Sequence, residues 1–310
     1  MPGEFSLIET YFKPLALLPE SLGLKDDAAL MSIPPGQELV VTTDAIISGI
    51  DFLGNEKPHL IAQKALRVNL SDLAAMGAKP YAYTLVIAAP KEVDADFWQG
   101  ISLGLAEDQK HFGIGLIGGD LSRTPGPLSL TITAFGLVPK GRALRRGTAK
   151  AGDGLFVSGA IGDSYLGLQS FKGQGGGDEY FRNRYLLPEP RVTLGEKLRE
   201  LATSAIDISD GLLADANHLA GGVEIELSAV PFSIFGQDEP ALLKLMSAGD
   251  DYELLFTAPL EKEADIKALS SHLDLKLTKI GRILNQGGVK VRAKDGGYLP
   301  LPELGHDHFA

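Results

Sequence analysis

The most constraining feature of the sequence is a helical segment that carries a single acid on its apolar face. The segment starts near Leu60 and is stopped by Gly77 and Pro80, two residue types that end helices. At about 100° per residue, one face consists of Ile61, Ala65, Val68, Asp72, Ala75 and Met76. Because an isolated carboxylate on a packing face is costly to desolvate, Asp72 needs a cation, a set of hydrogen-bond donors or an open cleft. A buried Asp that the protein itself satisfies is the alternative.

The same pattern, an Asp in a turn with Gly or Ser beside an apolar run, recurs along the chain. The further candidate acids are Asp27, Asp44, Asp120, Asp207 and Asp210. Turns and strand ends of this kind are where ligand sites concentrate. If the acids converge, two carboxylates at about 4 Å repel by roughly 4 kcal/mol at an effective dielectric of 20, and divalent cations relieve that repulsion. The alternative is separate turn formers and helix caps, the commonest use of Asp, to which Asp163 and Asp215 are assigned.

The available side chains favour magnesium as the cation. The chain has no cysteine, and its six histidines lack the spacing of metal ligands. Ligation by oxygen alone favours Mg²⁺ over zinc, and Mg²⁺ held by a few carboxylates commonly binds nucleotide phosphates. Arg145 and Arg146 either clamp a phosphate or lie on a solvated linker. The turn Gly159-x-x-Gly162 is a weak phosphate-loop signal.

Charge and composition exclude several classes of function. The net charge of -11 and the lack of a basic block argue against a nucleic acid or an anionic membrane as partner. Neither a nucleophile elbow nor a Walker A sequence occurs, and no apolar stretch approaches the ~20 residues of a membrane span. The first residues include an early acid and no apolar run, so we expect no secretory signal and a cytoplasmic protein.

Strand-like and helix-like segments alternate in both halves of the chain. We expect strands at residues 39–43, 81–88, 113–117, 128–138, 154–158, 223–227, 254–257, 275–284 and 289–291. We expect further helices at residues 94–112, 164–171, 190–201, 212–219, 238–246 and 260–272. Asp44 is expected at a strand end and Asp120 in a glycine turn, residues 118–123. The alternation predicts an α/β (α+β) fold with two domains, residues 1–138 and 139–310.

Six segments are recognisable when they are taken together. They are Asp26-Asp27-Ala28-Ala29, Thr42-Thr43-Asp44, the stretch from Val68 to Gly77, Gly118-Gly119-Asp120, the stretch from Ile206 to Gly211, and the stretch from Gly249 to Leu254. In this order, over nearly the whole chain, they resemble the thiamine-monophosphate kinase family of the aminoimidazole ribonucleotide synthetase superfamily. The resemblance implies a two-domain fold, with an N-terminal domain that binds ATP and Mg²⁺ and forms a homodimer, and a C-terminal α/β domain. It places ATP in a cleft between subunits and implies phosphorylation of thiamine monophosphate to thiamine diphosphate.

The resemblance also implies roles for single residues. The positions that match Mg²⁺ ligands are Asp27, Thr42, Thr43, Asp44, Asp72, Asp120, Asp207 and Asp210. The positions that match ATP contacts are Gly119, Asp120, Arg146 and Ser209, and those that match thiamine monophosphate contacts are Asp51, Asp250 and His306. Three positions depart from the family's common residues: Lys25 replaces Gly, Asp51 replaces His, and His306 replaces an aromatic residue.

The implied mechanism is direct in-line transfer without a protein nucleophile or base, because several Mg²⁺ ions can neutralise the two polyanions and positioning supplies the rest. Three alternatives stay open. One is another ATP-dependent enzyme of the superfamily, although selenophosphate synthetase is disfavoured because it uses a Cys or selenocysteine that this chain lacks. The others are a non-catalytic Mg-nucleotide-binding module and a structural protein whose acids cap helices.

Overall fold

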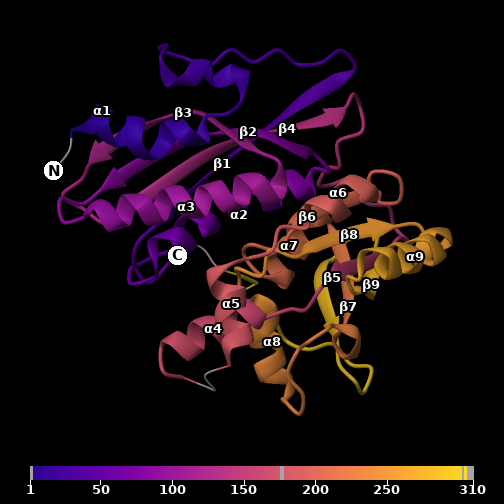
Figure 1. The fold of residues 1–310 in the computed structure, drawn as a ribbon. Coiled ribbons are helices and arrows are strands. Elements are labelled where there is room, and N and C mark those ends of the chain that lie inside the picture. Colours follow the sequence, from indigo (N-terminus) through magenta and orange to yellow (C-terminus); the bar gives the residue numbers. More distant parts are fainter. Residues whose placement is uncertain (1–2, 175–177, 302–303, 306–310) are drawn as a thin grey trace. The chain divides into compact units, whose positions relative to one another are not determined.

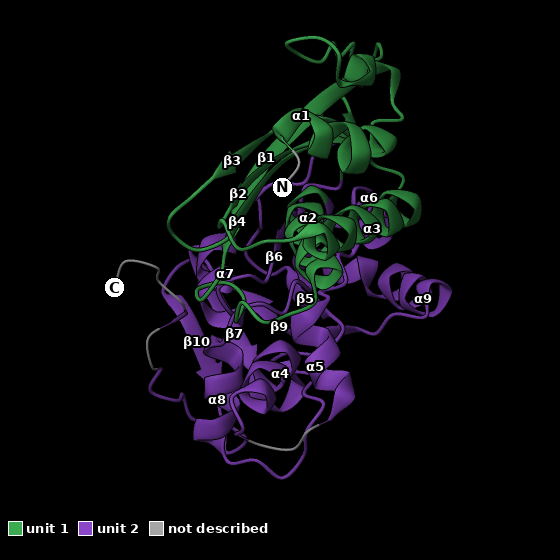
Figure 2. Cartoon of the chain, turned by 60° about the vertical axis from the view of Figure 1, so that its left-hand side comes forward, with its two compact units in different colours: residues 1–73, 78–141 green, residues 74–77, 142–310 purple. Residues whose placement is uncertain are grey.

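The computed structural model describes residues 3–174, 178–301 and 304–305 of the chain. These residues form two compact units, Met1–Leu73 with Ala78–Gly141 and Ala74–Gly77 with Arg142–Ala310 (Figure 2). The predicted division into domains of residues 1–138 and 139–310 stays a prediction. Among the described residues, no helix combines the length and apolar composition needed to cross a bilayer.

Unit 1 is built on a four-stranded sheet with the order β1-β4-β2-β3 (Figure 1). Its strands are β1 (Gln37–Ile47), β2 (Lys79–Ala89), β3 (Gly115–Arg123) and β4 (Ser129–Pro139). Strands β2 and β3 are parallel, and the other neighbours are antiparallel. The helices are α1 (Glu4–Leu7), α2 (Pro58–Ala75) and α3 (Ala95–Phe112), and single helical turns lie between residues 8 and 24.

The two faces of this sheet differ in burial because strand side chains alternate. On β4, Leu130, Ile132, Ala134 and Val138 are buried on the face that packs against α2 and α3. The residues between them are only half-buried. By strand register, the second face carries Val41, Thr43, Val86, Asp120, Thr131 and Thr133, and we call it the open face. Val41 and Val86 are 54% and 40% exposed there, although both lie within strands.

Unit 2 contains a six-stranded sheet with the order β10-β7-β9-β5-β8-β6. Its strands are β5 (Gly154–Ser158), β6 (Ser204–Asp207), β7 (Gly222–Glu226), β8 (Leu254–Ala258), β9 (Leu277–Ile283) and β10 (Gly288–Arg292). Its helices are α4 (Asp163–Phe171), α5 (Glu179–Leu186), α6 (Val192–Leu198), α7 (Leu212–Leu219), α8 (Glu239–Ser247) and α9 (Glu263–Leu273).

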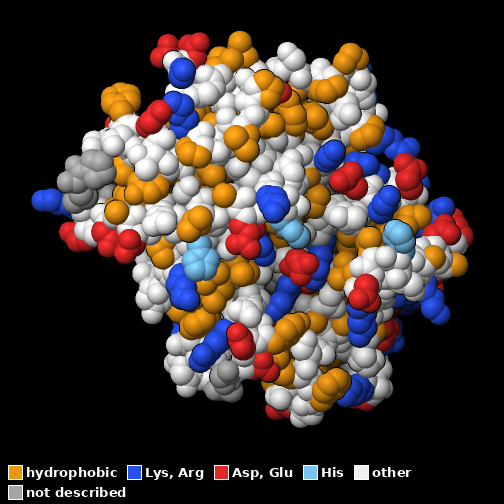
Figure 3. Space-filling model, viewed as in Figure 1, with side chains coloured by type: hydrophobic (Ala, Val, Ile, Leu, Met, Phe, Trp, Pro, Cys, Tyr) orange, Lys and Arg blue, Asp and Glu red, His pale blue; other side chains and the backbone are white. Residues whose placement is uncertain are grey.

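Helices cover both faces of the unit 2 sheet. Leu155 and Val157 of β5 join a core with α7 and α8, whereas Phe156 between them joins a second core with α6 and α9. All residues of β5 and β8 are buried, as expected for central strands covered on both faces. Around α9, acidic and basic side chains are interspersed on the surface (Figure 3), and Lys262 pairs with Asp265 at 3.2 Å.

The observed elements confirm most of the predicted ones and correct others. Strand β5 and helix α7 have the predicted bounds, and Asp94 caps α3 by accepting a hydrogen bond from the Phe97 N–H at 2.9 Å. The predicted strand end at Asp44 is wrong, because β1 continues to Ile47. The predicted glycine turn at residues 118–123 is also wrong, because these residues belong to β3. Helix α5 was not predicted, and α6 is shorter than residues 190–201.

Candidate functional site

The acid on the apolar helix face lies opposite strand β1. The hydroxyl of Thr42 donates a hydrogen bond to Oδ2 of Asp72. One turn earlier on α2, the buried Asn69 accepts a hydrogen bond from the backbone N–H of Asp44 at 3.1 Å. Asp72 therefore has a hydrogen-bond donor, as predicted for an acid in this position, and it stays partly exposed beside the strand that carries Thr42 and Asp44.

Thr43 differs from its two neighbours because strand side chains alternate. Its hydroxyl donates to the carbonyl oxygen of Ile132 at 3.1 Å and lies 3.1 Å from the hydroxyl of Thr133 on the open face. The side chains of Thr42 and Asp44 point to the helix-covered face instead. A cation bound beside Asp72 would therefore meet the side-chain oxygens of Thr42 and Asp44 but not that of Thr43.

A cavity of about 170 Å³ in unit 1 brings together three predicted ligand residues. Asp27, Gly119 and Asp120 line it, together with Asp26. Apolar side chains complete the wall: Ile8, Phe12, Leu24, Leu85, Leu116 and Leu121 are among them. The carboxylates of its lining suit a hydrated cation or a phosphate–cation complex, since oxygen is the ligand that Mg²⁺ prefers.

Gly119 is required at this point of β3 for a steric reason. A Cβ atom at Gly119 would lie 1.9 Å from the carbonyl oxygen of Leu85 on the neighbouring strand. Next to it, Asp120 accepts a hydrogen bond from the Ser122 hydroxyl at 2.7 Å. The glycine thus lets β2 and β3 approach closely and leaves the Asp120 carboxylate beside the cavity.

The structure groups the predicted unit 1 ligands into subsets. Thr42, Asp44 and Asp72 lie on the helix-covered side, Thr43 and Asp120 are on the open face, and Asp27 shares the cavity with Asp120. Among the described residues, three or more Asp, Glu or His side chains do not gather in a metal-binding arrangement. The convergence of all the acids on one site stays a prediction.

In unit 2, the turn that carries Ser209 and Asp210 is organised by a buried acid. Oδ2 of Asp215, in the first turn of α7, accepts hydrogen bonds from the N–H groups of Ser209, Asp210 and Gly211 at 3.1, 3.1 and 3.2 Å. Burial and the nearby Asp210 charge raise the pKa of Asp215 to about 7, against the effect of these N–H groups and of Arg146. These hydrogen bonds confirm the prediction that Asp215 is a turn-forming residue.

Asp250 lies beside this turn. Its N–H donates to the carbonyl oxygen of Ser209 at 2.9 Å, and the Tyr252 hydroxyl lies 3.3 Å from its Oδ1. A Cβ at Gly249 would lie 2.2 Å from the Ser209 carbonyl oxygen, so the two loops approach as closely as glycine allows. Asp207, at the end of β6, is buried at the start of the same turn.

The other predicted substrate residues have different surroundings. Oδ2 of Asp51 accepts a hydrogen bond from the Ile47 N–H at 2.7 Å, and its carbonyl oxygen accepts one from Nζ of Lys64 at 3.0 Å. Asp51 therefore also closes the turn after β1. Arg146 is exposed and close enough to Asp215 to affect its pKa. His306 lies outside the described residues.

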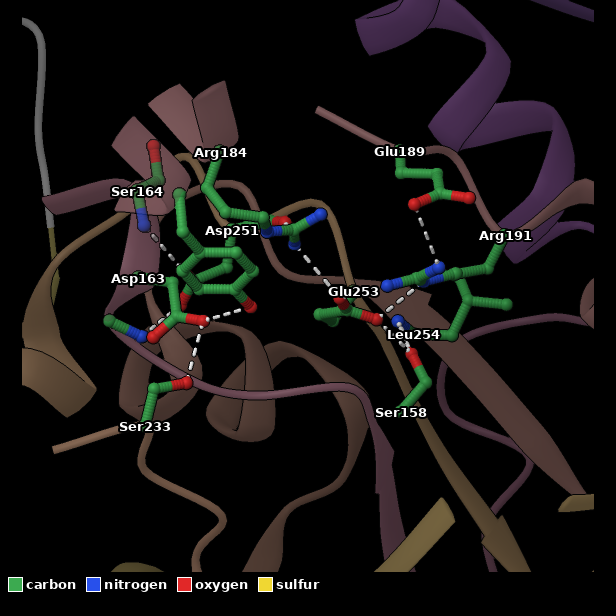
Figure 4. Close-up of polar contacts among 12 residues, drawn as sticks. Ser158, Asp163, Ser164, Arg184, Glu189, Arg191, Ser233, Asp251, Glu253 and Leu254 are labelled. Carbon is green, nitrogen blue, oxygen red and sulfur yellow. Dashed lines mark hydrogen bonds and ion pairs between the residues drawn. The ribbon is translucent and has the colours of Figure 1, made fainter. Parts of the chain in front are cut away.

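A buried polar cluster in unit 2 was not anticipated from the sequence (Figure 4). Glu253 accepts hydrogen bonds from Ser158 at 2.5 Å, from Nε of Arg191 at 2.7 Å and from Arg184 at 2.9 Å. Burial by itself raises the pKa of Glu253, but the two guanidinium groups and the Ser158 hydroxyl outweigh it and lower that pKa. The acids at positions 250, 251 and 253 do not by themselves predict the cluster, because both arginines are distant in the sequence.

The neighbouring Asp251 explains the turn Gly159-x-x-Gly162. Its Oδ2 accepts a hydrogen bond from the Gly162 N–H at 2.8 Å, and its Oδ1 lies 3.4 Å from the Ser164 N–H. The start of α4 is therefore occupied by a carboxylate of the chain itself, so the weak phosphate-loop signal is wrong here. Burial raises the pKa of Asp251 to about 8, although these N–H groups and Arg184 favour its charged form.

The chain is similar to known proteins over almost its whole length. Residues 25–138 match the family described as AIR synthase related protein, N-terminal domain. The chain is 40% identical to the thiamine-monophosphate kinase of Escherichia coli K12, over 99% of this chain and 98% of that one. It is 38% identical to the thiamine-monophosphate kinase of Caulobacter vibrioides, over 96% and 89% of the two chains.

Solved structures agree with this similarity. Thiamine-monophosphate kinase from Stenotrophomonas maltophilia K279a superimposes with a TM-score of 0.83 at 39% identity, covering 96% of this chain and 98% of that one. AaThiL complexed with AMPPCP and TMP gives a TM-score of 0.76 at 28% identity, covering 98% and 97%. The hydrogenase maturation protein HypE, at 19% identity and a TM-score of 0.78, shares the fold. By its full-length similarity to these enzymes, the chain belongs to the thiamine-monophosphate kinase family.

Proposed function

We propose that this chain transfers the γ-phosphoryl group of ATP to thiamine monophosphate, giving ADP and thiamine diphosphate. The observation that carries the proposal is the cavity in unit 1, where two candidate Mg²⁺ ligands, Asp27 and Asp120, meet the candidate ATP contact Gly119. The similar structure with AMPPCP and TMP supports both ligands for this chain. A site rich in carboxylates and lacking a built nucleophile suits a reaction between two anions.

The proposed ligand sets follow the sequence assignments. Mg²⁺ would be held by Asp27, Thr42, Thr43, Asp44, Asp72, Asp120, Asp207 and Asp210, and ATP by Gly119, Asp120, Arg146 and Ser209. Thiamine monophosphate would be held by Asp51, Asp250 and His306. The donors fit the cation because they are oxygens only, and a bound Mg²⁺ supplies positive charge against the phosphates. Asp51 and Asp250 favour the cationic thiazolium ring of the substrate electrostatically.

The chemical step needs no base from the protein. A phosphate monoester has a second pKa of about 6, so its oxygens are largely deprotonated at neutral pH. One of these oxygens forms the new bond to the γ-phosphorus, the bond from that phosphorus to the β–γ bridging oxygen breaks, and ADP leaves with the electron pair. The residues of the chain bind and align the two anions, which is where the rate gain of such reactions arises.

We also propose that the chain works as a homodimer through the open face of unit 1. Val41 and Val86 are exposed in the middle of their strands, where an apolar side chain ordinarily packs against another layer. Thr131 and Thr133 lie on the same face and are able to pair across an interface. A second copy with the same face supplies a self-complementary partner.

The test is a coupled assay of ADP release with MgATP, with and without thiamine monophosphate. The proposal expects release that depends on thiamine monophosphate, and mass spectrometry of the product should show one added phosphoryl group. Release driven only by a different acceptor would indicate another enzyme of the superfamily. Binding of MgATP without any release would indicate a nucleotide-binding module and would overturn the proposal.

A further inference from the structure

The loop that presents Asp250 has an unusual backbone. Asp250 and Tyr252 have φ angles of 71° and 50°, in the left-handed region that residues with a side chain seldom adopt. Such a conformation costs free energy and persists only where the surroundings enforce it. The neighbouring residues Asp251 and Glu253 are the candidates for holding the loop in this conformation.

The alternating side chains, Asp251 and Glu253, are each only 1% exposed. Glu253 receives both Nε and Nη2 of Arg191, at 2.7 and 2.5 Å, and Nη2 of Arg184 at 2.9 Å (Figure 4). The same Arg184 nitrogen donates to the carbonyl oxygen of Asp251 at 3.1 Å. One guanidinium thus binds a side chain and the backbone of the loop at once.

The Glu253 carboxylate has no room to shift. A Cβ atom at Gly159 would lie 2.2 Å from its Oε1, so the backbone of the turn after β5 lies directly against it. The side chains of Arg184 and Arg191 are 11% and 14% exposed, and they close the other side. The carboxylate is therefore fixed by charge and by contact.

The opposite side of the loop is fixed by backbone hydrogen bonds. The Asp250 N–H donates to the Ser209 carbonyl oxygen at 2.9 Å, and the Tyr252 N–H donates to the Ile208 carbonyl oxygen at 2.8 Å. The Ile208 N–H in turn donates to the Glu253 carbonyl oxygen at 2.9 Å. Glu253 is thus linked to the strand that leads into Ser209 and Asp210.

We infer that Glu253, with Arg184 and Arg191, is a positioning residue for Asp250: it holds the loop in the left-handed conformation that aims the Asp250 carboxylate at the substrate. It does not touch the substrate. The inference rests on the proposed function, in which Asp250 binds the cationic part of thiamine monophosphate. Arg184 on α5 extends the set of residues that determine substrate affinity to a helix outside the predicted site.

The test compares Glu253→Gln with Glu189→Gln. Glu189 is an exposed partner of the same Arg191, at 3.5 Å, and provides the matched control. In Glu253→Gln we expect the KM for thiamine monophosphate to rise at least tenfold, with the KM for ATP within twofold and kcat within threefold. Glu189→Gln should leave all three within twofold. Arg184→Lys should retain more substrate affinity than Arg184→Met, because it keeps the charge.

Hydrogen exchange separates this inference from the proposed function. The amides of Asp250 and Tyr252 should exchange at least tenfold faster in Glu253→Gln, while amides of β7 and β9 keep their rates. A wild-type chain without activity toward thiamine monophosphate overturns the proposed function, and exchange still tests the loop. An active wild type with unchanged substrate KM and unchanged loop exchange in the variant overturns the inference, as does an equal rise in both KM values.

A milder variant covers the case in which Glu253→Gln does not fold. Ser158→Ala removes one hydrogen bond from Glu253 and keeps both ion pairs. It should raise the KM for thiamine monophosphate about threefold and accelerate exchange only at Asp250, Tyr252 and Leu254, whose N–H loses the Ser158 hydroxyl as its acceptor. Uniform acceleration throughout unit 2 would show a purely structural role and would overturn the inference.

Discussion

Gly159 offers a direct measure of how strongly unit 2 depends on its buried ion cluster. Its φ is 60°, and an added Cβ would lie 2.2, 2.4 and 2.7 Å from the three carboxyl atoms Oε1, Cδ and Oε2 of Glu253. Gly236 has a similar φ of 77°, but a Cβ there meets no atom within 4 Å. Substituting each glycine by Ala therefore adds the same backbone strain, and only one substitution disturbs the cluster.

The expected magnitudes differ clearly. Ala in a left-handed conformation costs about 1–2 kcal/mol, which is the whole expected effect of Gly236→Ala. Gly159→Ala also displaces Glu253 from its arginines, and breaking a buried pair costs about 3–5 kcal/mol. The free energy of unfolding should therefore fall by about 4–7 kcal/mol in Gly159→Ala.

The measurement is urea unfolding followed by far-UV circular dichroism on both variants and on the wild type. Equal losses of stability in Gly159→Ala and Gly236→Ala, within about 0.5 kcal/mol, would refute the argument that contact with Glu253 makes glycine necessary, because surface substitutions alone usually stay within that range.

The remaining predictions concern turnover, pH and assembly. Asp72→Asn and Asp210→Asn should each abolish ADP release while circular dichroism stays unchanged; near-normal activity in either variant contradicts its assignment as a Mg²⁺ ligand. Between pH 3.8 and about 8, the folded chain keeps a proton on Asp251 that the unfolded chain has released, so the free energy of unfolding should decrease as pH rises through this range. Asp251→Asn should reduce that slope and leave the part below about pH 7 to which the raised pKa of Asp215 contributes, and an unchanged slope would show that Asp251 is not its source. Val41→Lys should convert a dimer of 32.9 kDa chains into monomers by light scattering, whereas the exposed-site control Leu260→Lys should not; a dimer that survives Val41→Lys places the interface elsewhere.

The elements governed by local pattern were predictable from the sequence. In β4, residues that become buried alternate with residues that stay half-exposed. Helix α7 begins directly after Gly211 and is rich in apolar residues. Gly118 and Gly119 are misleading because glycine is also a turn signal, and only the pairing with β2 reveals that close approach to Leu85 is what requires Gly119. Helix α5 is eight residues long and buries only Tyr185, so its apolar pattern is too short to mark a helix.

The sequence predicts residues of the candidate site but not the buried residues that hold them in place. Asp27 and Asp120 are separated by most of unit 1, and the structure places both at one cavity. By contrast, Glu253 lies in the stretch from Gly249 to Leu254 but has no role that the sequence predicts, because its partners Arg184 and Arg191 are 69 and 62 residues away. Long-range pairing of buried charges leaves no local periodic trace, so only the folded chain shows it.

The Asp251 carboxyl group at the beginning of α4 affects where anions are able to bind. Backbone amides at a helix beginning attract any anion, and a chain proposed to handle ATP and a second phosphate ester meets many anions. Since the buried Asp251 carboxyl group already accepts the hydrogen bond of the Gly162 N–H, a phosphate at this place would find that donor engaged. The Asp251 side chain therefore takes the place that a phosphate would otherwise occupy at the beginning of α4.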